Sequence, residues 1–468
     1  MIAAAILSLA CHAGASSFTN FSNTNGQSTA NMDIIVKFKG NADINSIGLG
    51  RSINHQSALI PQFNVNLLQV HQRMDVAGLL KQLQNHPMVE YAQFDHPVTA
   101  RVAKTEEVPV LGPVMDSMPN DPSFNGQWSM SLSDTNFGID AINAWLTYGT
   151  GGKDILNNDI VVAVVDGGVE ITHKDLVDNV WTNMQEIAGN GIDDDENGYV
   201  DDINGWNGYS NSGTLQTSGH GTHVAGIVGA KGNNDLQVAG VNWDVKLMDV
   251  PGSSGNTSVI LRAYGYILAQ KQLWLDTNGA KGANVVATNS SFGIDGANCA
   301  SGQYPAWNDI YTEMGKAGIL SAAATANRNW NIDDVGDVPT GCDSPYIISV
   351  TNNQSNGTKA SAGYGKTTID LAAPGTRILS TYTRNTTRSL TGTSMATPHV
   401  AGAVAFLASI ASKPLNDLYM NDPAAAAMEM KRMIMETVTP MDNFKDNTVA
   451  GGILNLNSAA AEVSKFGM

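Results

Sequence analysis

Three short stretches, far apart in the chain, carry an acid, a base and a nucleophile. Asp166 lies in Val-Val-Asp-Gly-Gly, His220 begins His-Gly-Thr-His-Val-Ala-Gly, and Ser394 lies in Gly-Thr-Ser-Met-Ala-Thr-Pro. A carboxylate can hold an imidazole in one tautomer, and that imidazole can take the proton of a serine hydroxyl as it attacks a carbonyl carbon. These residue types therefore predict acyl-transfer chemistry, provided that folding brings the three side chains together.

Each of the three residues is expected at the end of a secondary-structure element. Asp166 ends the β-branched run 160–165, which is typical of a buried parallel strand. His220 begins a small-residue run that predicts a helix packed closely on the sheet. Ser394 precedes an apolar run with Pro398 in its first turn, which predicts a helix N-terminus. The free amide groups and the dipole of that N-terminus would stabilise a developing oxyanion.

Together these stretches resemble the motifs of the subtilisin-like serine proteases, the subtilases. The resemblance extends over roughly residues 121–465 and includes Ala-Ala-Pro-Gly at 372–375. It implies an α/β fold, a three-layer sandwich with a mostly parallel central sheet. It also implies a triad in which Asp166 orients His220, His220 acts as general base and then acid, and Ser394 forms an acyl-enzyme.

The same resemblance implies a side-chain amide for the oxyanion and a strand edge for the substrate. In subtilases the amide follows an alanine-glycine run; here Asn327 follows Ala-Ala-Ala-Thr-Ala, and Asn329 is the alternative. Ser291, Phe292 and Gly293 resemble the substrate-binding strand, which would pair with an extended peptide through main-chain hydrogen bonds. We expect Phe292 to form an apolar wall of the specificity pocket.

An acidic loop between the first two motifs predicts a Ca²⁺ site. Residues 193–204 fit the spacing D-x-[DN]-x-[DN]-G of an EF-hand-like loop, with Asn204 in the twelfth position where glutamate is usual. Repulsion among its carboxylates would disorder the loop without a cation; a solvated acidic loop is the alternative. The expected ligands are Asp193, Asp195, Asn197, the Tyr199 carbonyl, and Asp201 or Asp202.

A second Ca²⁺ site is implied by resemblance to thermitase-like subtilases and not by residue spacing. In those proteins an aspartate near the mature N-terminus, the aspartate of a His-x-Asp-Leu stretch and an asparagine-containing loop share one ion. The corresponding groups here are the side chains of Asp121, Asp175 and Asn234 and the carbonyls of Lys231, Leu236 and Val238.

The first 120 residues differ in pattern from the rest of the chain. Residues 1–15 combine a short apolar stretch with Ala-Gly-Ala and resemble a secretory signal. Residues 32–98 show a β-β-α-β order that resembles the inhibitor prodomain of subtilases, a small α+β domain. Residues 99–120 lack periodicity and predict an exposed linker that contains the processing bond. The catalytic domain is then expected over residues 121–468.

Composition agrees with an exported protease that acts on proteins or peptides. The chain has 43 acidic and 26 basic residues, a formal charge of −17, which disfavours nucleic acid as a partner. No stretch approaches the roughly 20 apolar residues of a membrane span. Cys299 and Cys342 are expected to pair in an exported chain. We expect a secreted monomer with its own prodomain as intramolecular inhibitor.

Two other classes of protein stay open, and the histidines suggest one further hypothesis. His220 and His223 could ligate zinc in a hydrolase, or the chain could be a catalytically inactive calcium-binding protein. Protonation at about pH 6 would loosen the inhibitor if a prodomain histidine is neutral at the interface. Four of the nine histidines lie in the prodomain region: His55, His71, His86 and His96.

Overall fold

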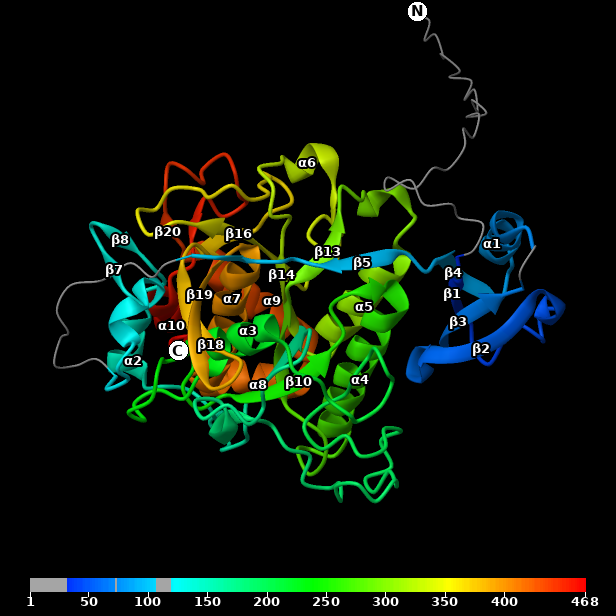
Figure 1. The fold of residues 1–468 in the computed structure, drawn as a ribbon, viewed down its shortest axis with the longest axis horizontal. Coiled ribbons are helices and arrows are strands. Elements are labelled where there is room, and N and C mark those ends of the chain that lie inside the picture. The colour runs from blue at the N-terminus through cyan, green and yellow to red at the C-terminus, as the bar shows by residue number, and fades with distance from the viewer. Residues whose placement is uncertain (1–31, 72–73, 107–118) are drawn as a thin grey trace, which may run out of the picture.

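The computed structural model describes residues 32–71, 74–106 and 119–468, which form a small N-terminal domain beside a larger α/β domain (Figure 1). The expected signal segment, residues 1–15, lies outside the described residues. So do residues 107–118 of the expected linker.

The N-terminal domain is a four-stranded sheet, in the order β2-β3-β1-β4, covered on one face by a helix. Strand β1, one of the two inner strands, is buried on both faces. Its residues Ile34 and Val36 pack toward the helix, and Ile35 packs toward the large domain. One strand, β2, is absent from the predicted β-β-α-β order because its middle is polar and mostly exposed. The elements are β1 (Ile34–Phe38), β2 (Ile53–Ile60), β3 (Val65–Val70), α1 (Val76–Gln84) and β4 (Val89–Phe94).

The large domain is built on an eight-stranded sheet in the order β10-β9-β12-β14-β16-β17-β21-β20. All its pairs are parallel except β20 with β21. Apolar β-branched runs form the centre because both faces of the sheet are covered. The strands are β9 (Val161–Asp166), β10 (Lys246–Pro251), β12 (Val285–Ser290), β14 (Leu320–Ala324), β16 (Ile347–Asn353), β17 (Leu371–Pro374), β20 (Thr439–Pro440) and β21 (Gly452–Ile453).

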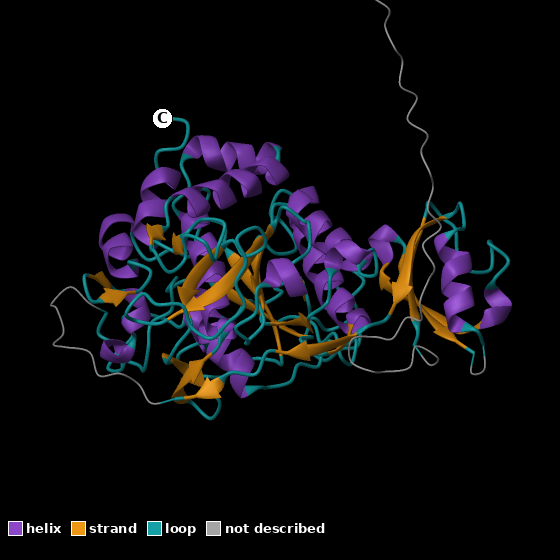
Figure 2. Cartoon of the chain, turned by 90° about the horizontal axis from the view of Figure 1, so that it is seen from above, coloured by secondary structure: helices purple, strands orange, loops and turns teal. Residues whose placement is uncertain are grey.

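Helices cover both faces of this sheet, which confirms the predicted three-layer sandwich (Figure 2). Within β9, Val162 and Val164 pack in one core and Val161, Ala163 and Val165 in the other, as strand alternation requires. The first face carries α2 (Ala141–Tyr148), α3 (Gly219–Gly229), α7 (Thr393–Ser409), α8 (Lys413–Asn421), α9 (Pro423–Glu436) and α10 (Leu456–Val463). The second carries α4 (Thr257–Asp276) and α5 (Pro305–Lys316).

Short elements complete the large domain and its cleft. They are β5 (Pro97–Ala100), β6 (Lys104–Thr105), β7 (Leu132–Ser133), β8 (Asn136–Phe137), β11 (Gly255–Asn256), β13 (Phe292–Asp295), α6 (Ile332–Val335), β15 (Asp337–Val338), β18 (Ile378–Tyr382) and β19 (Thr386–Thr391). Cys299 and Cys342 form a disulfide with a Cα–Cα distance of 5.0 Å. No single helix among the described residues is long and apolar enough to cross a bilayer.

The N-terminal domain rests on α4 and α5 of the large domain. Lys37 forms an ion pair with Asp309 of α5 (2.8 Å), and Gln93 accepts a hydrogen bond from the Ala306 amide (2.9 Å). At the start of α4, Asp95 accepts hydrogen bonds from the amide and the hydroxyl of Ser258, each 2.7 Å long. The chain that leaves the N-terminal domain is therefore held at the start of α4, against the large domain.

Candidate active site

Asp166 and His220 meet where β9 ends and α3 begins. The His220 Nδ1 atom lies 2.9 Å from both carboxylate oxygens of Asp166, which is 2% exposed. A side chain at Gly221 would prevent this approach, because a Cβ there would lie 2.3 Å from the carbonyl oxygen of Gly168. The carboxylate thereby fixes the orientation of the imidazole and leaves Nε2 free to act.

The electrostatic setting of His220 suits a general base. Burial lowers its pKa, but the charge and hydrogen bond of Asp166, with a contribution from the Arg101 carbonyl, outweigh burial and raise the pKa above its ordinary value. The Arg101 carbonyl lies near the ring, but Nε2 makes no hydrogen bond of full geometry among the described residues, with Ser394 or any other group. The imidazole can therefore accept a proton and hold the positive charge against Asp166.

Ser394 is the second residue of α7 and is fully buried. Its hydroxyl donates a hydrogen bond to the carbonyl oxygen of Arg101 (2.8 Å). Pro398 lies in the second turn of α7 and not in the first, because the helix already begins at Thr393. Proline has no amide hydrogen to donate to the carbonyl of Ser394, which instead accepts the hydroxyl of Ser291 (3.3 Å).

The segment that follows the N-terminal domain runs across the large domain as an extended chain (Figure 1), and it pairs with strand edges on both sides of Ser394, which form a cleft around it. The part of the segment that precedes its contact with Ser394 pairs antiparallel with β13, where Thr99 lies opposite Gly293. The same part pairs with β11 along its other edge. The part that follows this contact pairs with β19, where Thr105 lies opposite Leu390. Residues 99–106 were expected in an exposed linker; they lie in the cleft because strand edges from distant parts of the chain supply their main-chain partners.

The predicted substrate-binding strand contacts this segment through main-chain atoms. The Ser291 carbonyl accepts the amide of Arg101 (3.1 Å), and the Gly293 carbonyl accepts the hydroxyl of Thr99 (3.3 Å). Phe292 is 0% exposed, and its ring packs with aromatic rings of α4 and α5 in the second core. Phe292 was expected in a pocket wall, but strand alternation directs its side chain into the core.

The two candidate asparagines for the oxyanion lie in different surroundings. The Asn327 Nδ2 atom lies 3.4 Å from the carbonyl oxygen of Val102, and its Oδ1 accepts the amide of Thr393 (2.9 Å). Asn329 is exposed, and its Oδ1 accepts a hydrogen bond from Lys359 (2.5 Å). Of the two, Asn327 is the one next to both the cleft segment and Thr393, the residue before Ser394.

His223 does not share a site with His220. Its Nε2 lies 2.9 Å and 3.0 Å from the carbonyl oxygens of Arg388 and Ile378, so it links α3 to the β18–β19 hairpin. Burial lowers the pKa of His223 to about 3. The two rings use their nitrogens for different partners, which does not match a zinc-binding pair.

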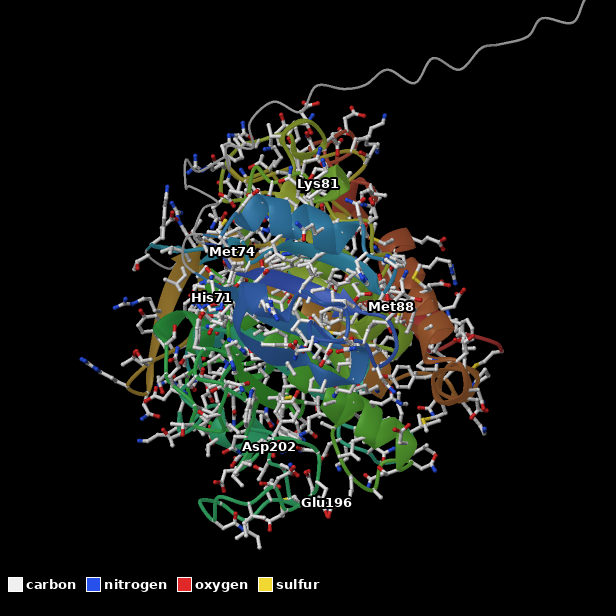
Figure 3. All side chains as sticks on the ribbon, turned by 90° about the vertical axis from the view of Figure 1, so that its right-hand side faces the viewer. His71, Met74, Lys81, Met88, Glu196 and Asp202 are labelled. Atoms are coloured by element: carbon white, nitrogen blue, oxygen red, sulfur yellow. A yellow bond between two sulfur atoms is a disulfide. The ribbon has the colours of Figure 1, made fainter. Side chains whose placement is uncertain are left out.

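The acidic loop projects from the large domain, with Glu196 at its outer end and Asp202 toward the body of the molecule (Figure 3). Oxygens of Asp193, Asp195 and Glu186 lie within 4.8 Å of one another. The sequence pattern missed Glu186, which precedes the loop and is invisible to the EF-hand spacing. This carboxylate cluster has the oxygen chemistry that Ca²⁺ requires.

The other predicted ligands of the loop point to different partners. Asp202 is fully buried and accepts hydrogen bonds from the side-chain amides of Asn183, Asn197 and Gln270. Burial raises the pKa of Asp202 to about 7. The Asp201 carboxylate accepts backbone amides of residues 189–191 and so lies outside the carboxylate cluster.

Three side chains of the second predicted Ca²⁺ site, those of Asp121, Asp175 and Asn234, come together at the surface loop 231–238. Asp121 accepts the backbone amide of Asn233 (2.7 Å), and Asp175 accepts the side-chain amide of Asn234 (2.9 Å) and the amide of Val238 (3.0 Å). Both carboxylates are buried, and neither pairs with a lysine or arginine among the described residues. Burial raises the pKa of Asp121 to about 6. Two buried carboxylates without a protein cation fit a bound Ca²⁺.

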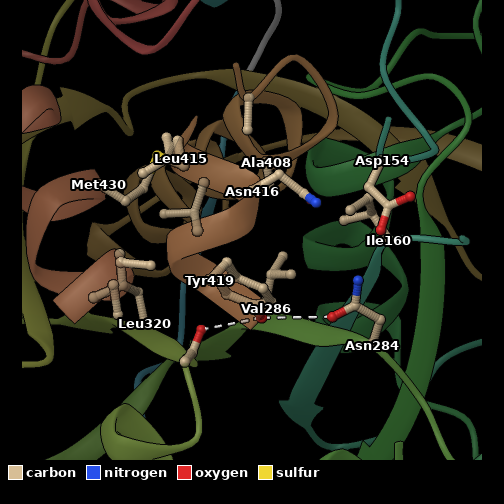
Figure 4. Close-up of a pocket in the computed structure, with 15 residues that line it drawn as sticks. Asp154, Ile160, Asn284, Val286, Leu320, Ala408, Leu415, Asn416, Tyr419 and Met430 are labelled. Carbon is tan, nitrogen blue, oxygen red and sulfur yellow. Dashed lines mark hydrogen bonds between the residues drawn. The ribbon is translucent and has the colours of Figure 1, made fainter. Parts of the chain in front are cut away.

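A small cavity lies away from the triad, between the sheet and helices α7, α8 and α9 (Figure 4). Its volume is about 40 Å³, and its walls are mostly apolar, with Ile160, Leu320 and Met430 among them. The side-chain oxygen of Asn284 at its edge is already bonded to Lys271 (2.7 Å). The cavity is therefore a gap in core packing and not a substrate site.

Comparison with known proteins places this geometry in one family. The model of the subtilase family matches residues 157–455, and that of the fervidolysin N-terminal prodomain matches residues 23–95. Subtilisin-like protease 1 of Plasmodium falciparum is 28% identical over 362 residues, 73% of this chain and 47% of that protein. Thermitase of Thermoactinomyces vulgaris is 31% identical over 300 residues, 62% of this chain and 85% of thermitase.

Solved structures agree with this result. Fervidolysin from Fervidobacterium pennivorans superposes with a TM-score of 0.64 at 19% identity, covering 92% of this chain and 61% of fervidolysin. A protease of Pseudoalteromonas arctica gives a TM-score of 0.53 at 26% identity, covering 74% of this chain and all of that one. The chain spans about half the length of its Plasmodium relatives. It belongs to the subtilase family and carries a fervidolysin-like N-terminal prodomain.

Proposed function

We propose that this chain is a serine endopeptidase made as a self-processed zymogen. One observation carries the proposal: the Ser394 hydroxyl is hydrogen-bonded to the main-chain carbonyl of Arg101, and the same carbonyl acts on the imidazole of His220, which a buried aspartate holds. A hydroxyl, a base and a peptide carbonyl in this arrangement suit nucleophilic attack on a peptide bond.

The roles of the side chains follow from their positions. Ser394 attacks the carbonyl carbon of the bound peptide while His220 takes its proton, and Asp166 stabilises the imidazolium that forms. Asn327 and the N-terminal amides of α7 stabilise the oxyanion. His220 then returns the proton to the leaving amine, and water hydrolyses the acyl-enzyme. Ser291 and Gly293 hold the substrate backbone.

The prodomain acts as the inhibitor of its own enzyme. It is docked on α4 and α5 through an ion pair, hydrogen bonds and apolar residues of its sheet, and it continues directly into the strand that fills the cleft. A strand held on both sides of the nucleophile excludes other peptides. Removal of the prodomain is therefore needed for activity on other proteins.

We also propose that Ca²⁺ stabilises the enzyme at two places. Bound Ca²⁺ would supply positive charge to carboxylates that otherwise repel each other. Asp193, Asp195 and Glu186 would hold one ion at the acidic loop; Asp121, Asp175 and Asn234, with carbonyls of the loop 231–238, would hold the other. Export of the chain is supported by its disulfide and by an extracellular protease of Xanthomonas campestris that is 29% identical over 408 residues.

Self-processing of the expressed precursor tests the proposal. The wild-type precursor should divide into prodomain and mature enzyme, and the mature enzyme should hydrolyse casein. Ser394→Ala should abolish both reactions, whereas Ser301→Ala, an exposed serine, should change neither.

Two outcomes would contradict the proposal in different ways. A wild-type precursor that stays whole and inactive would favour a catalytically inactive calcium-binding protein. Activity that survives Ser394→Ala but is lost with a zinc chelator would favour the zinc hydrolase.

A further inference from the structure

The main chain of the cleft segment presents one carbonyl group to the nucleophile. The Arg101 amide donates to the Ser291 carbonyl (3.1 Å), and the Arg101 carbonyl accepts the Ser394 hydroxyl (2.8 Å). Arg101 is thus held on one side by the substrate-binding strand and on the other by the nucleophile. Its carbonyl carbon is the one that Ser394 faces.

The side chain of Arg101 leaves the cleft and is buried in a pocket whose wall includes the paired strands β13 and β15. It is 3% exposed, and its Nη2 is bonded to Asp337 and lies 3.4 Å from Asp295. These two aspartates lie opposite each other in the β13–β15 pair. Gly293 forms the wall: a Cβ there would lie 2.4 Å from Nη2 and 2.8 Å from Cζ of Arg101. The pocket therefore accepts a long side chain and ends in negative charge.

Charge makes this pocket selective. Asp337 is fully buried, and Arg101 is its one lysine or arginine ion-pair partner among the described residues. A buried carboxylate is costly unless it is paired with a cation. Burial raises the pKa of Asp337 to about 7, against the lowering effect of Arg101. When the prosegment leaves, the pocket loses this cation, and an arginine or lysine side chain of a substrate would restore the ion pair.

The side chain of the residue after Arg101 is not held in any pocket. Val102 is 80% exposed, and beyond it the chain is held by main-chain pairing of β6 with β19. Upstream, Val98 is 3% exposed and lies in the apolar core that also contains Phe292. We therefore expect the enzyme to select its substrates by the side chain of the residue before the scissile bond. We also expect it to prefer an apolar residue three positions earlier.

From these contacts we propose that Arg101–Val102 is the bond the enzyme cleaves in its own precursor, and that Asp337, assisted by Asp295, makes it a protease selective for arginine or lysine before the scissile bond. Arg101 Nε and Nη1 have no protein partner among the described residues, so the pocket recognises charge more than guanidinium shape. Lysine should therefore be accepted beside arginine.

The processing step balances with water as the only co-reactant. Ser394 Oγ forms a bond to the Arg101 carbonyl carbon and gives its proton to His220. The bond between that carbon and the Val102 nitrogen breaks, and His220 gives the proton to this nitrogen. Water then hydrolyses the ester, which leaves a carboxylate on Arg101 and restores the Ser394 hydroxyl.

The first test is the position of self-cleavage and rests on the proposed function. N-terminal sequencing of the earliest mature fragment should begin at Val102. Arg101→Lys should still process there, whereas Arg101→Leu should slow processing at least about tenfold or move it to another bond. An earliest fragment that begins elsewhere, for example at Ala103, would overturn the assignment even though the protease is active.

The second test uses peptide amides on the mature wild-type enzyme, so it needs no variant to fold. Val-Thr-Ala-Arg and Val-Thr-Ala-Lys amides should have kcat/KM values at least about 100-fold above that of Val-Thr-Ala-Phe. Equal values for the three peptides would overturn the selectivity while leaving the triad intact. No turnover of any peptide, with no self-processing, would instead refute the proposed function.

A charge variant then assigns the selectivity to the pocket. Asp337→Asn should lower the arginine-to-phenylalanine ratio of kcat/KM by about 30-fold or more, mainly through KM for the arginine peptide. Asp343→Asn removes the same charge from an exposed position of the loop after β15 and should leave the ratio unchanged. An unchanged ratio in a folded Asp337→Asn enzyme, checked by its unfolding temperature, would refute the role of Asp337.

Discussion

Among the described residues of the prodomain region, His96 is the one histidine buried at the contact with the large domain. It is 5% exposed, its ring lies 4.6 Å from that of Tyr304, and its carbonyl accepts the amide of Thr257 (2.8 Å). Burial lowers the pKa of His96 from 6.5 to about 4. His55, by contrast, is exposed. The histidine hypothesis therefore narrows to one residue.

The direction of the pH effect follows from this lowered pKa. The docked prodomain favours neutral His96, so its stabilisation is complete above pH 6.5 and is lost as the pH falls from 6.5 toward 4. The full loss is about 3 kcal/mol, from about 1.36 kcal/mol for each pKa unit. Between about pH 7.5 and pH 5.5, only part of this is lost, and the prodomain should bind about tenfold more weakly.

Release of the processed prodomain measures this effect. A dye-labelled prodomain, still bound after self-cleavage, should leave the enzyme about tenfold faster at about pH 5.5 than at about pH 7.5, since affinity changes act mostly on dissociation. His96→Gln should remove most of this acceleration, and His55→Gln should keep it. The same acceleration in His96→Gln would refute the reasoning and assign the pH effect to another group.

Three other predictions concern catalysis and metal binding. Asn327→Ala should lower kcat by about 10²- to 10³-fold with little change in KM, while Asn329→Ala leaves both unchanged; equal effects in peptide kinetics would refute the assignment. Asp166→Asn should lower kcat by about 10⁴-fold in the same assay, and a loss under tenfold would contradict the role of the carboxylate. Removal of Ca²⁺ with EDTA should lower the unfolding temperature, by less in Glu186→Gln than in Glu196→Gln; an EDTA-indifferent melting curve would count against both metal sites.

The fold and the position of the triad motifs were predictable because each rests on a local pattern. The β-branched run before Asp166 and the small-residue run after His220 specify a buried strand and a closely packed helix, and the structure forms β9 and α3 there. The helix after Ser394 was predicted too, although its start was placed too late relative to Pro398. The secondary structure of such segments can be predicted because it depends on their own residue pattern and not on distant parts of the chain.

The contents of the cleft were not predictable because they depend on pairing between distant segments. Residues 99–106 have no periodicity of their own, and strand edges from β13 and β19 impose their extended conformation. Asp337 lies in a two-residue strand, where a single aspartate gives no sign of being buried. Glu186 joins Asp193 and Asp195 only through the course of the loop between them.

The central claim is that Ser394, activated by His220, attacks the carbonyl presented in this cleft. Mass spectrometry after reaction of the mature enzyme with a diphenyl phosphonate analogue of Val-Thr-Ala-Arg tests it most directly. The account predicts one covalent adduct, on the peptide that contains Ser394. An adduct on another residue, or no adduct on a mature enzyme that hydrolyses Val-Thr-Ala-Arg amide, would contradict it.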